Sequence, residues 1–263
     1  EPFLNLLCQG MVLKDGSKMS KSKGNVVDPD EIIDKYGADT LRLFVMFVAP
    51  PDQSFEWSDQ GVQGASRYLN RLWNLVQRFI ELDSQESPSF KDSSEQVSKL
   101  RTKSHQTLHK IKDDYIRRHS FNTAIASIME LTNAIPKEFL NSQASLAEKS
   151  ATREAIEIIL ICLSPITPHL THSLWEQLGN KVAIINVNWP DPNEDFLENL
   201  ETEIAIQING KLRGTITIDP DLPEDAIKEK AKEEGNVKKY IIGKQIKKII
   251  YIEKKLINLV VTD

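Results

Sequence analysis

Cysteine is scarce in this sequence, and long apolar runs are absent. The 263 residues include two cysteines, Cys8 and Cys162, with no Cys-x-x-Cys pair near either of them. A disulfide framework or a structural zinc site is therefore not expected, and a reducing compartment fits. No stretch of about 18 apolar residues occurs, and no basic region followed by an apolar segment opens the chain. These absences predict a cytoplasmic protein with no membrane partner.

The composition is that of an ordinary globular protein. Hydrophobic residues make up 40% and charged residues 27% of the chain, which is enough apolar mass for a proper core. The length exceeds the usual single-domain size of about 100 to 200 residues, so more than one folding unit is expected. The first residues lack a methionine and run directly into an apolar stretch, as in a piece cut from a larger protein. We therefore expect a fragment or a subunit.

Four segments with different sequence patterns follow one another, and together they predict a multidomain α+β protein. The first is a strand-like run with a polar loop, and the second is a compact helical unit. A helical bundle and a small α+β domain follow. The expected boundaries are 1–27, 28–57, 58–190 and 203–263.

The compact helical unit begins with a clear start signal. Asp28 and Glu31 have the spacing of a capping box, and Pro29 occupies the first helical position. Gly37 ends this short helix at Tyr36. A second, apolar helix is expected over 40–48, where two prolines stop it.

From residue 58 onward, the apolar residues repeat with the period of a helix. The bundle helices after this first one are expected over about 95–118, 121–135 and 147–163. Core packing is the default expectation for an aromatic residue at helical spacing. This expectation covers Trp57, Trp73, Trp175 and Trp189.

The tail is distinguished by a switch to strand period and by an excess of lysine. Asn209-Gly210 lies between two alternating strands, which is a strong hairpin signal. A short helix is expected over about 223–234, closed near Gly235, and two further strands end the chain. The net charge is −5, yet residues 203–263 hold 12 Lys and Arg against 10 Asp and Glu. A local basic patch can hold a polyanion because salt screens charges beyond roughly 8 Å.

One loop has the composition needed for phosphate chemistry. The string Lys18-Met19-Ser20-Lys21-Ser22 lies between Gly16 and Gly24. Two ammonium groups on a loop rich in hydroxyl and backbone donors can neutralise charge that develops on a leaving pyrophosphate. A solvated Lys/Ser loop is the alternative interpretation. This particular pentapeptide would arise by chance on the order of once in 10³ to 10⁴ chains of this length.

Longer stretches of the sequence support the functional interpretation of the loop. They are QGMVL at 9–13, KMSKSKGNVVDP at 18–29, YGADTLRLFVMFVAPP at 36–51, EWSDQGVQGASRYLNRLW at 56–73, FNTAIASIMEL at 121–131, SPITPHLTHSLWEQL at 164–178 and QINGKLRGTI at 207–216. Over essentially the whole chain, they resemble the leucyl-tRNA synthetase family of class I aminoacyl-tRNA synthetases. Valyl, isoleucyl and methionyl enzymes share some of these elements, whereas MFVAPP, EWSD and the NGK-x-RG hairpin resemble leucyl members.

The resemblance implies the end of a Rossmann-type catalytic domain, a mainly helical tRNA-binding bundle and a small α+β C-terminal tRNA-binding domain. In this family the loop binds the phosphates of ATP, which carries Mg²⁺, and stabilises the transition state of amino-acid adenylation. The corresponding residues are Lys18, Met19, Ser20, Lys21 and Ser22, with Lys21 the main contact and Lys18 the next. The family's HxGH-type motif, its editing domain and a leucine-specific insertion are absent. The leucine pocket, the editing site and half of the ATP site are thus expected outside this chain.

Several basic side chains are candidates for contact with RNA. By the resemblance, the tail would meet the outer corner and the long variable arm of tRNA-Leu. The candidates are Arg67, Arg71, Lys211, Arg213, Lys247, Lys248, Lys254 and Lys255. The tail residues make the stronger case because little acid surrounds them. The bundle arginines, with Arg78 beside them, could equally belong to a solvated helix face.

Other polar residues are expected to be structural. His169 and His172 lack a third ligand nearby, and a catalytic zinc needs three protein ligands, so no metal site is expected. Asp39 and Arg42 are interpreted as a helix-start carboxylate and its structural partner.

The sequence therefore predicts the C-terminal portion of a leucine–tRNA ligase that is inactive alone and works with the N-terminal catalytic and editing part. One alternative is another class I synthetase of the valyl, isoleucyl or methionyl type. The other is a non-catalytic tRNA-binding subunit of a split synthetase.

Overall fold

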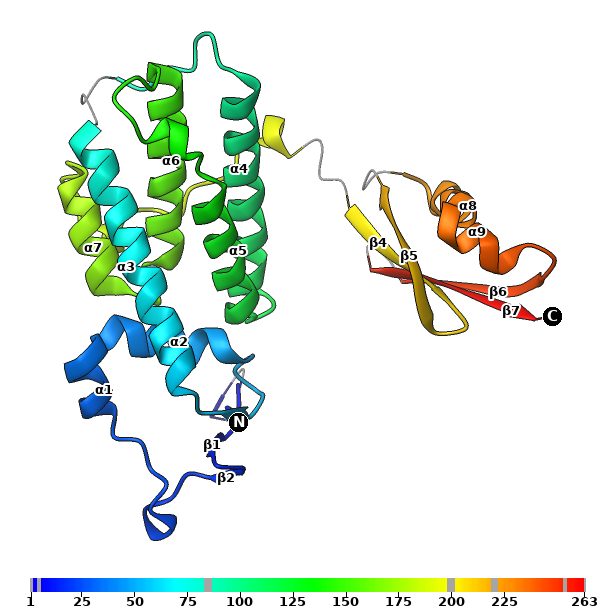
Figure 1. Ribbon diagram of the computed structural model, residues 1–263, viewed down its shortest axis with the longest axis horizontal. Coiled ribbons are helices and arrows are strands. Elements are labelled where there is room, and N and C mark those ends of the chain that lie inside the picture. Colours follow the sequence, from blue (N-terminus) through cyan, green and yellow to red (C-terminus); the bar gives the residue numbers. More distant parts are fainter. Residues whose placement is uncertain are drawn as a thin grey trace. The chain divides into compact units, whose positions relative to one another are not determined.

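The structure is a computed structural model that describes residues 2–3, 6–82, 87–197, 202–218, 222–252 and 255–262. The chain divides into two compact units, Glu1–Phe196 and Leu197–Asp263. The first unit is mostly helical, and the second combines a sheet with two helices (Figure 1). The finer division into four segments stays a prediction. None of the helices in the described ranges is long and apolar enough to cross a membrane.

A three-stranded sheet of order β2-β1-β3 opens the first unit. Strand β1 (Val12–Lys14) pairs antiparallel with β2 (Ser17–Lys18) and parallel with β3 (Phe55–Glu56). Asp15 and Gly16 make the turn of the β1–β2 hairpin with positive φ angles of 56° and 69°. The expectation of one strand followed directly by a loop was wrong here, although Asp-Gly is a hairpin signal that the sequence displays.

Two helices connect this sheet to the bundle. Helix α1 (Pro29–Tyr36) has the expected bounds, and α2 (Ala38–Val48) begins slightly before the expected residue 40. The Asp28 carboxylate accepts a hydrogen bond from the Asp30 N–H at 3.0 Å. Between Asp28 and Glu31, both described, no reciprocal capping-box bond forms, so a simple aspartate cap replaces the expected motif.

In the described residues, five helices build the bundle; the first four agree with the expected positions within a few residues, and α7 was not predicted as a helix. They are α3 (Asp59–Leu82), α4 (Glu95–Ile116), α5 (Phe121–Ala134), α6 (Leu146–Leu163) and α7 (Pro168–Gln177). Short 3₁₀ turns occur at η1 (Lys21–Lys23), η2 (Lys137–Phe139), η3 (Ile184–Asn186) and η4 (Glu194–Phe196).

Helix α6 is the most deeply buried element of the bundle. Its start has a complete capping box, in which Ser145 and Glu148 exchange side-chain-to-backbone bonds of 3.2 and 2.7 Å. Ile156, Ile159 and Leu160 are fully buried along it, so it forms the centre of the hydrophobic core. Of the tryptophans expected in the core, Trp175 is buried. The other three, Trp57, Trp73 and Trp189, pack against the core while half-buried.

The second unit is a four-stranded sheet of order β5-β4-β7-β6 with two helices. Its elements are β4 (Thr202–Ile208), β5 (Lys211–Ile218), α8 (Glu224–Glu233), α9 (Gly235–Ile241), β6 (Gln245–Ile252) and β7 (Leu256–Thr262). Asn209 and Gly210 make the predicted hairpin turn with φ angles of 49° and 78°. Helix α8 matches the helix expected over about 223–234, whereas α9 was not expected; the Glu234 side chain accepts hydrogen bonds from the Asn236 and Val237 N–H groups at its start.

Candidate functional site

The predicted phosphate loop follows directly from the β1–β2 hairpin. Lys18 ends β2, Lys21 begins the 3₁₀ turn η1, and Gly24 closes that turn in the left-handed region with a φ of 68°. Lys18, Lys21 and Ser22 are exposed, whereas Met19 and Ser20 are half-buried. The ammonium groups of both lysines make no hydrogen bond or ion pair with the residues that the structure describes. The loop therefore presents two uncompensated positive charges to solvent.

A side chain that the sequence analysis did not single out holds this loop. Asn25 follows η1, and its amide contacts both the hairpin and the start of the turn. Ser20 also lies 3.2 Å, oxygen to oxygen, from the Ser22 hydroxyl. At the other end of the hairpin, the Gly16 N–H donates to the Glu56 carboxylate on β3 at 3.2 Å. The loop is thus fixed by polar contacts at both ends, while no residue of η1 is buried.

Two of the predicted RNA-binding arginines line a groove between α2 and α3. The groove has a volume of about 820 Å³, and its apolar wall includes Phe44, Phe47 and Val48. Arg67 and Arg71 lie on its rim, without a carboxylate partner among the described residues. The Arg71 guanidinium lies 5.6 Å from the centre of the Tyr68 ring. Arg78, by contrast, pairs with Glu81 at 3.1 Å.

The predicted tail residues differ in how free they are. Lys211, Lys247, Lys248 and Lys255 are exposed and make no side-chain bond to a described residue. The register of β6 shifts between Ile246 and Lys248, so two consecutive lysines reach solvent where regular alternation would turn one inward. Arg213 is engaged within the unit, since it lies 4.2 Å from the centre of the Tyr240 ring and donates to its hydroxyl at 3.2 Å. Lys254 lies outside the described residues.

Known proteins match this chain over its whole length. Residues 1–58 match the family model "tRNA synthetases class I (I, L, M and V)", and residues 98–228 match "Anticodon-binding domain of tRNA ligase". Curated relatives named leucine–tRNA ligase from Nitrosococcus oceani and Methylobacillus flagellatus are each 48% identical, over 100% and 99% of this chain. The chain belongs to the leucyl-tRNA synthetase family. It spans 32% of the length of each of these relatives and corresponds to a C-terminal part.

Solved structures of synthetases show the same fold. The LeuRS of Agrobacterium radiobacter K84, titled as a ternary complex with tRNA and LeuAMS, is 29% identical with a TM-score of 0.68. The match covers 100% of this chain and 34% of that one. A methionyl-tRNA synthetase of Mycobacterium tuberculosis is 21% identical with a TM-score of 0.55, and it covers 65% of this chain and 38% of its own. The second likeness concerns the fold alone.

Polar contacts join helix α2 to the segment in which α6 ends and α7 begins. The Asp39 carboxylate accepts from the Leu170 N–H at 2.7 Å and lies 2.8 Å from Nδ1 of His169. Arg42 donates to the carbonyl oxygens of Ile166 and Pro165 at 2.8 and 2.9 Å. Asp39 therefore caps the first turn of α7 from a neighbouring helix, and Arg42 satisfies carbonyls that follow α6. Both residues have structural contacts, as expected, but Asp39 caps α7 and not the start of its own helix, and Arg42 binds backbone carbonyls and not Asp39.

The histidines of α7 are each bound to a carboxylate. His169 contacts Asp39, and Nε2 of His172 lies 3.4 Å from Glu176. Among the residues that the structure describes, no group of three or more His, Cys, Asp or Glu is placed to hold a metal. His169 lies in the first turn of α7, as expected for a helix-start residue, but its side chain is 76% exposed and that of His172 is 41% exposed, so the expected packing role was wrong for both.

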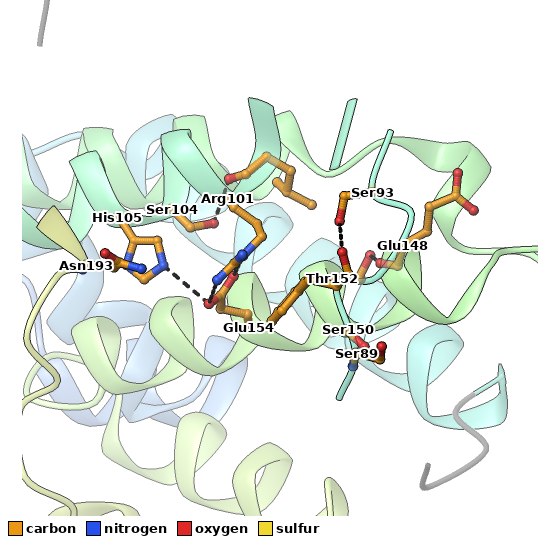
Figure 2. A network of polar contacts seen from close by, with 12 residues as sticks. Ser89, Ser93, Arg101, Ser104, His105, Glu148, Ser150, Thr152, Glu154 and Asn193 are labelled. Atoms are coloured by element: carbon orange, nitrogen blue, oxygen red, sulfur yellow. Dashed lines mark hydrogen bonds and ion pairs between the residues drawn. The ribbon is translucent and has the colours of Figure 1, made fainter. Parts of the chain in front are cut away.

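The region that matches the second family model also contains a partly buried polar network, shown in Figure 2. Arg101 on α4 makes two hydrogen bonds of 2.8 and 3.1 Å to Glu154 on α6. Nε2 of His105 lies 3.2 Å from Glu154, and Nδ1 accepts from the Asn193 N–H at 3.2 Å. His105 stacks on Phe196 with 5.0 Å between ring centres. The network therefore joins two helices to the chain segment that follows the bundle.

The charges in this network are internally satisfied. Burial alone would raise the pKa of the Glu154 carboxyl, but hydrogen bonds from His105 and Arg101 outweigh it and hold that pKa below its ordinary value. Elsewhere in the bundle, the hydroxyl of Tyr68 lies 3.1 Å from that of Thr132. Burial raises the pKa of Tyr68 to about 12. At neutral pH the Glu154 carboxylate is therefore ionised and the Tyr68 phenol is neutral, and both groups have partners within the first unit.

Proposed function

We propose that this chain is the C-terminal portion of a cytoplasmic leucine–tRNA ligase. The complete enzyme would attach leucine to tRNA-Leu in two steps, adenylation with ATP and transfer to the terminal adenosine. This chain would supply the ATP-phosphate loop and surfaces for tRNA-Leu. The observation that carries the proposal is the pair of exposed, uncompensated lysines, Lys18 and Lys21, on a braced loop in a chain of this family.

The loop suits a triphosphate on chemical grounds. Lys18 and Lys21 offer ammonium groups, and Ser20 and Ser22 add hydroxyl donors. During adenylation, negative charge grows on the leaving pyrophosphate, and fixed positive charges stabilise that transition state more than the bound ground state. Met19 lies between Lys18 and Ser20 with a half-buried side chain. Mg²⁺ would enter with ATP, since ATP itself offers phosphate oxygens as ligands.

The rest of the chain would position the tRNA. We assign residues 1–27 to the end of the Rossmann-type catalytic domain, 28–57 to a stem-contact helical unit, 58–190 to the anticodon-binding-type bundle and 203–263 to the C-terminal tRNA-binding domain. Support for these roles comes from the two family models and from the free cations on the groove and on the tail. The contacts would be mostly with phosphates.

This fragment would be inactive by itself, because the HxGH-type half of the ATP site and the leucine pocket are expected in the N-terminal part. Leucine-dependent pyrophosphate exchange by the purified 263-residue chain would contradict this expectation. A non-catalytic tRNA-binding subunit is the remaining alternative. It predicts that Lys21→Ala leaves adenylation by the assembled enzyme unchanged.

Deleting the tail from the complete ligase tests the division of labour. We expect removal of 203–263 to weaken tRNA binding while leucyl-adenylate formation stays nearly unchanged. The slope of log affinity against log salt should fall by roughly 0.7 to 0.9 for every phosphate that the tail no longer binds. Filter binding over a salt series and pyrophosphate exchange measure the two quantities. Equal loss of adenylation and of tRNA binding would make the tail a structural brace.

A further inference from the structure

The predicted phosphate loop, residues 18–22, needs an interaction that maintains its conformation. Lys18, Lys21 and Lys23 are all exposed, so their like charges repel one another at short range. Apolar packing contributes little, because the 3₁₀ turn Lys21–Lys23 contains no buried residue. Ser20 precedes this turn, and its side chain makes no capping bond. Something other than a core or a helix cap must hold the loop.

The structure assigns this task to Asn25, whose single amide binds three successive parts of the loop. Its Oδ1 accepts from the Ser20 N–H at 2.9 Å. Its Nδ2 faces the carbonyl oxygens of Lys14 and Lys18 at 3.2 and 3.3 Å and the Ser17 hydroxyl at 3.2 Å. One half-buried side chain therefore connects both strands of the hairpin to the start of the lysine turn. We propose that Asn25 is a positioning residue for adenylation, an inference that rests on the function proposed above.

The contacts explain why an amide is suited to this position. The Lys18 carbonyl and the Ser20 N–H lie on either side of Met19, and Asn25 binds both. It thereby fixes the path of the backbone between the two reactive lysines. A carboxylate could accept from Ser20, but it would turn a negative oxygen toward several carbonyl oxygens. An alanine would leave the Ser20 N–H and the hairpin carbonyls without this partner.

Asn25 acts through the lysines and not on ATP itself. Its amide is occupied by the backbone of the loop, whereas the Lys18 and Lys21 ammonium groups have no partner among the described residues. Loss of the brace should therefore reduce the stabilisation of the transition state, which depends on placing charge within a fraction of an ångström. It should leave leucine binding intact, since leucine binds elsewhere. The expected signature is a fall in kcat without a matching rise in the leucine KM.

The test compares variants of the complete ligase in ATP–pyrophosphate exchange, with rates referred to titrated active sites. We expect Asn25→Ala to lower kcat at least tenfold with the leucine KM within twofold of the parent. Asn25→Asp should be at least as impaired as alanine. Asn141→Ala is the matched control, because Asn141 also braces a turn through the Glu138 carbonyl and the Gln143 N–H, but within the bundle. It should leave both constants within twofold.

A second measurement follows the loop itself, so that the result does not depend on catalysis alone. Trypsin cleavage after Lys21 in the complete enzyme, followed by mass spectrometry, should be at least fivefold faster for Asn25→Ala and unchanged for Asn141→Ala. The inference is overturned if cleavage is unchanged, if kcat stays within twofold, or if the leucine KM rises as much as kcat falls. If Lys21→Ala also leaves kcat intact, the proposed function of the loop fails together with it. If Lys21→Ala collapses kcat and Asn25→Ala does not, the positioning role alone fails.

Discussion

In the part of the chain that the structure describes, positively charged side chains of the bundle interior are paired with carboxylates, whereas those of the predicted binding surfaces are not. Inside the bundle, Arg101 and Arg153 are paired with carboxylates on α6 at 2.8 and 3.0 Å, and their side chains are 18% and 22% exposed. On the phosphate loop, Lys18 and Lys21 have no such partner among the described residues. The same holds for Lys247 and Lys248 of β6. A paired cation is already neutralised, so it can stabilise the fold but adds little to the attraction of a polyanion.

This difference separates candidates that residue type alone could not. Three arginines lie on α3, yet Arg78 is paired with Glu81 while Arg67 and Arg71 have no carboxylate partner in the described part of the chain. These two unpaired arginines are the ones that line the groove. Substitution of an unpaired cation should therefore change function at constant stability. Substitution within a pair should do the reverse.

The largest expected effect is that of Lys21→Ala on adenylation. An unchanged kcat would contradict the distinction between paired and unpaired cations. In the complete ligase we expect kcat of adenylation to fall by about 10² to 10³, which is typical when one preorganised group that stabilises the transition state is removed. The leucine KM and the thermal midpoint should stay near the parent values, because the ammonium group makes no bond to a described residue. Pyrophosphate exchange and calorimetry measure these quantities. A change confined to the leucine KM would count against the role.

The double variant Lys247→Glu/Lys248→Glu should have the next largest effect. If both lysines meet phosphates, the salt slope of tRNA binding should fall by roughly 1.4 to 1.8. Lys228→Glu/Lys232→Glu is a control with the same change in net charge, because these two lysines are already paired with Glu224 and Glu229 at 2.7 and 2.6 Å. Equal slopes for the two variants would show that the tail acts only through its total charge.

Glu154→Gln tests whether the paired cations of the bundle contribute to stability and not to adenylation. It keeps the shape of the side chain but removes the charge that binds Arg101 and His105. We expect the free energy of unfolding to fall by about 1 to 3 kcal/mol, with adenylation unchanged. Glu81→Gln, whose pair with Arg78 is more than half exposed, should cost less than about 1 kcal/mol. Denaturant unfolding of both variants provides the measurement.

The smallest expected effect concerns how the stability difference between the parent and Glu154→Gln depends on acidic pH. Because the pKa of Glu154 is lower in the folded chain than its ordinary value of 4.5, its contribution is complete above that pH. The contribution is lost as the pH falls through the lower, folded-state pKa. The stability difference between the parent and Glu154→Gln should therefore shrink below pH 4.5. A difference that is constant with pH would assign the loss to shape instead of charge.

Sequence pattern was sufficient where one local rule decided the structure. The bounds of α1 and the hairpin at Asn209-Gly210 follow from short signals, and the structure confirms both. The pattern could not show which cations are paired, since Arg101 and its carboxylate on α6 are far apart in the chain. Nor could it reveal the role of Asn25, because its partners are mostly backbone atoms that come together only in the folded hairpin. The turn at Asp15-Gly16 is a different case, because the sequence contains its hairpin signal but we did not predict the β1–β2 hairpin.

The two polar anchors of α2 also have a mechanical consequence. Asp39 and Arg42 form hydrogen bonds with two separate points, Leu170 in α7 and Ile166 just before it. A tilt of α2 would therefore displace this part of the bundle as well. Helix α1 meets α2 at Gly37, which has a φ of 85° that side chains rarely adopt, and the Thr40 hydroxyl of α2 donates to the Tyr36 carbonyl of α1 at 2.7 Å. The lysine loop is therefore coupled to the bundle along two routes, one through α1 and α2 and the other through the pairing of β1 with β3, which leads directly into α3.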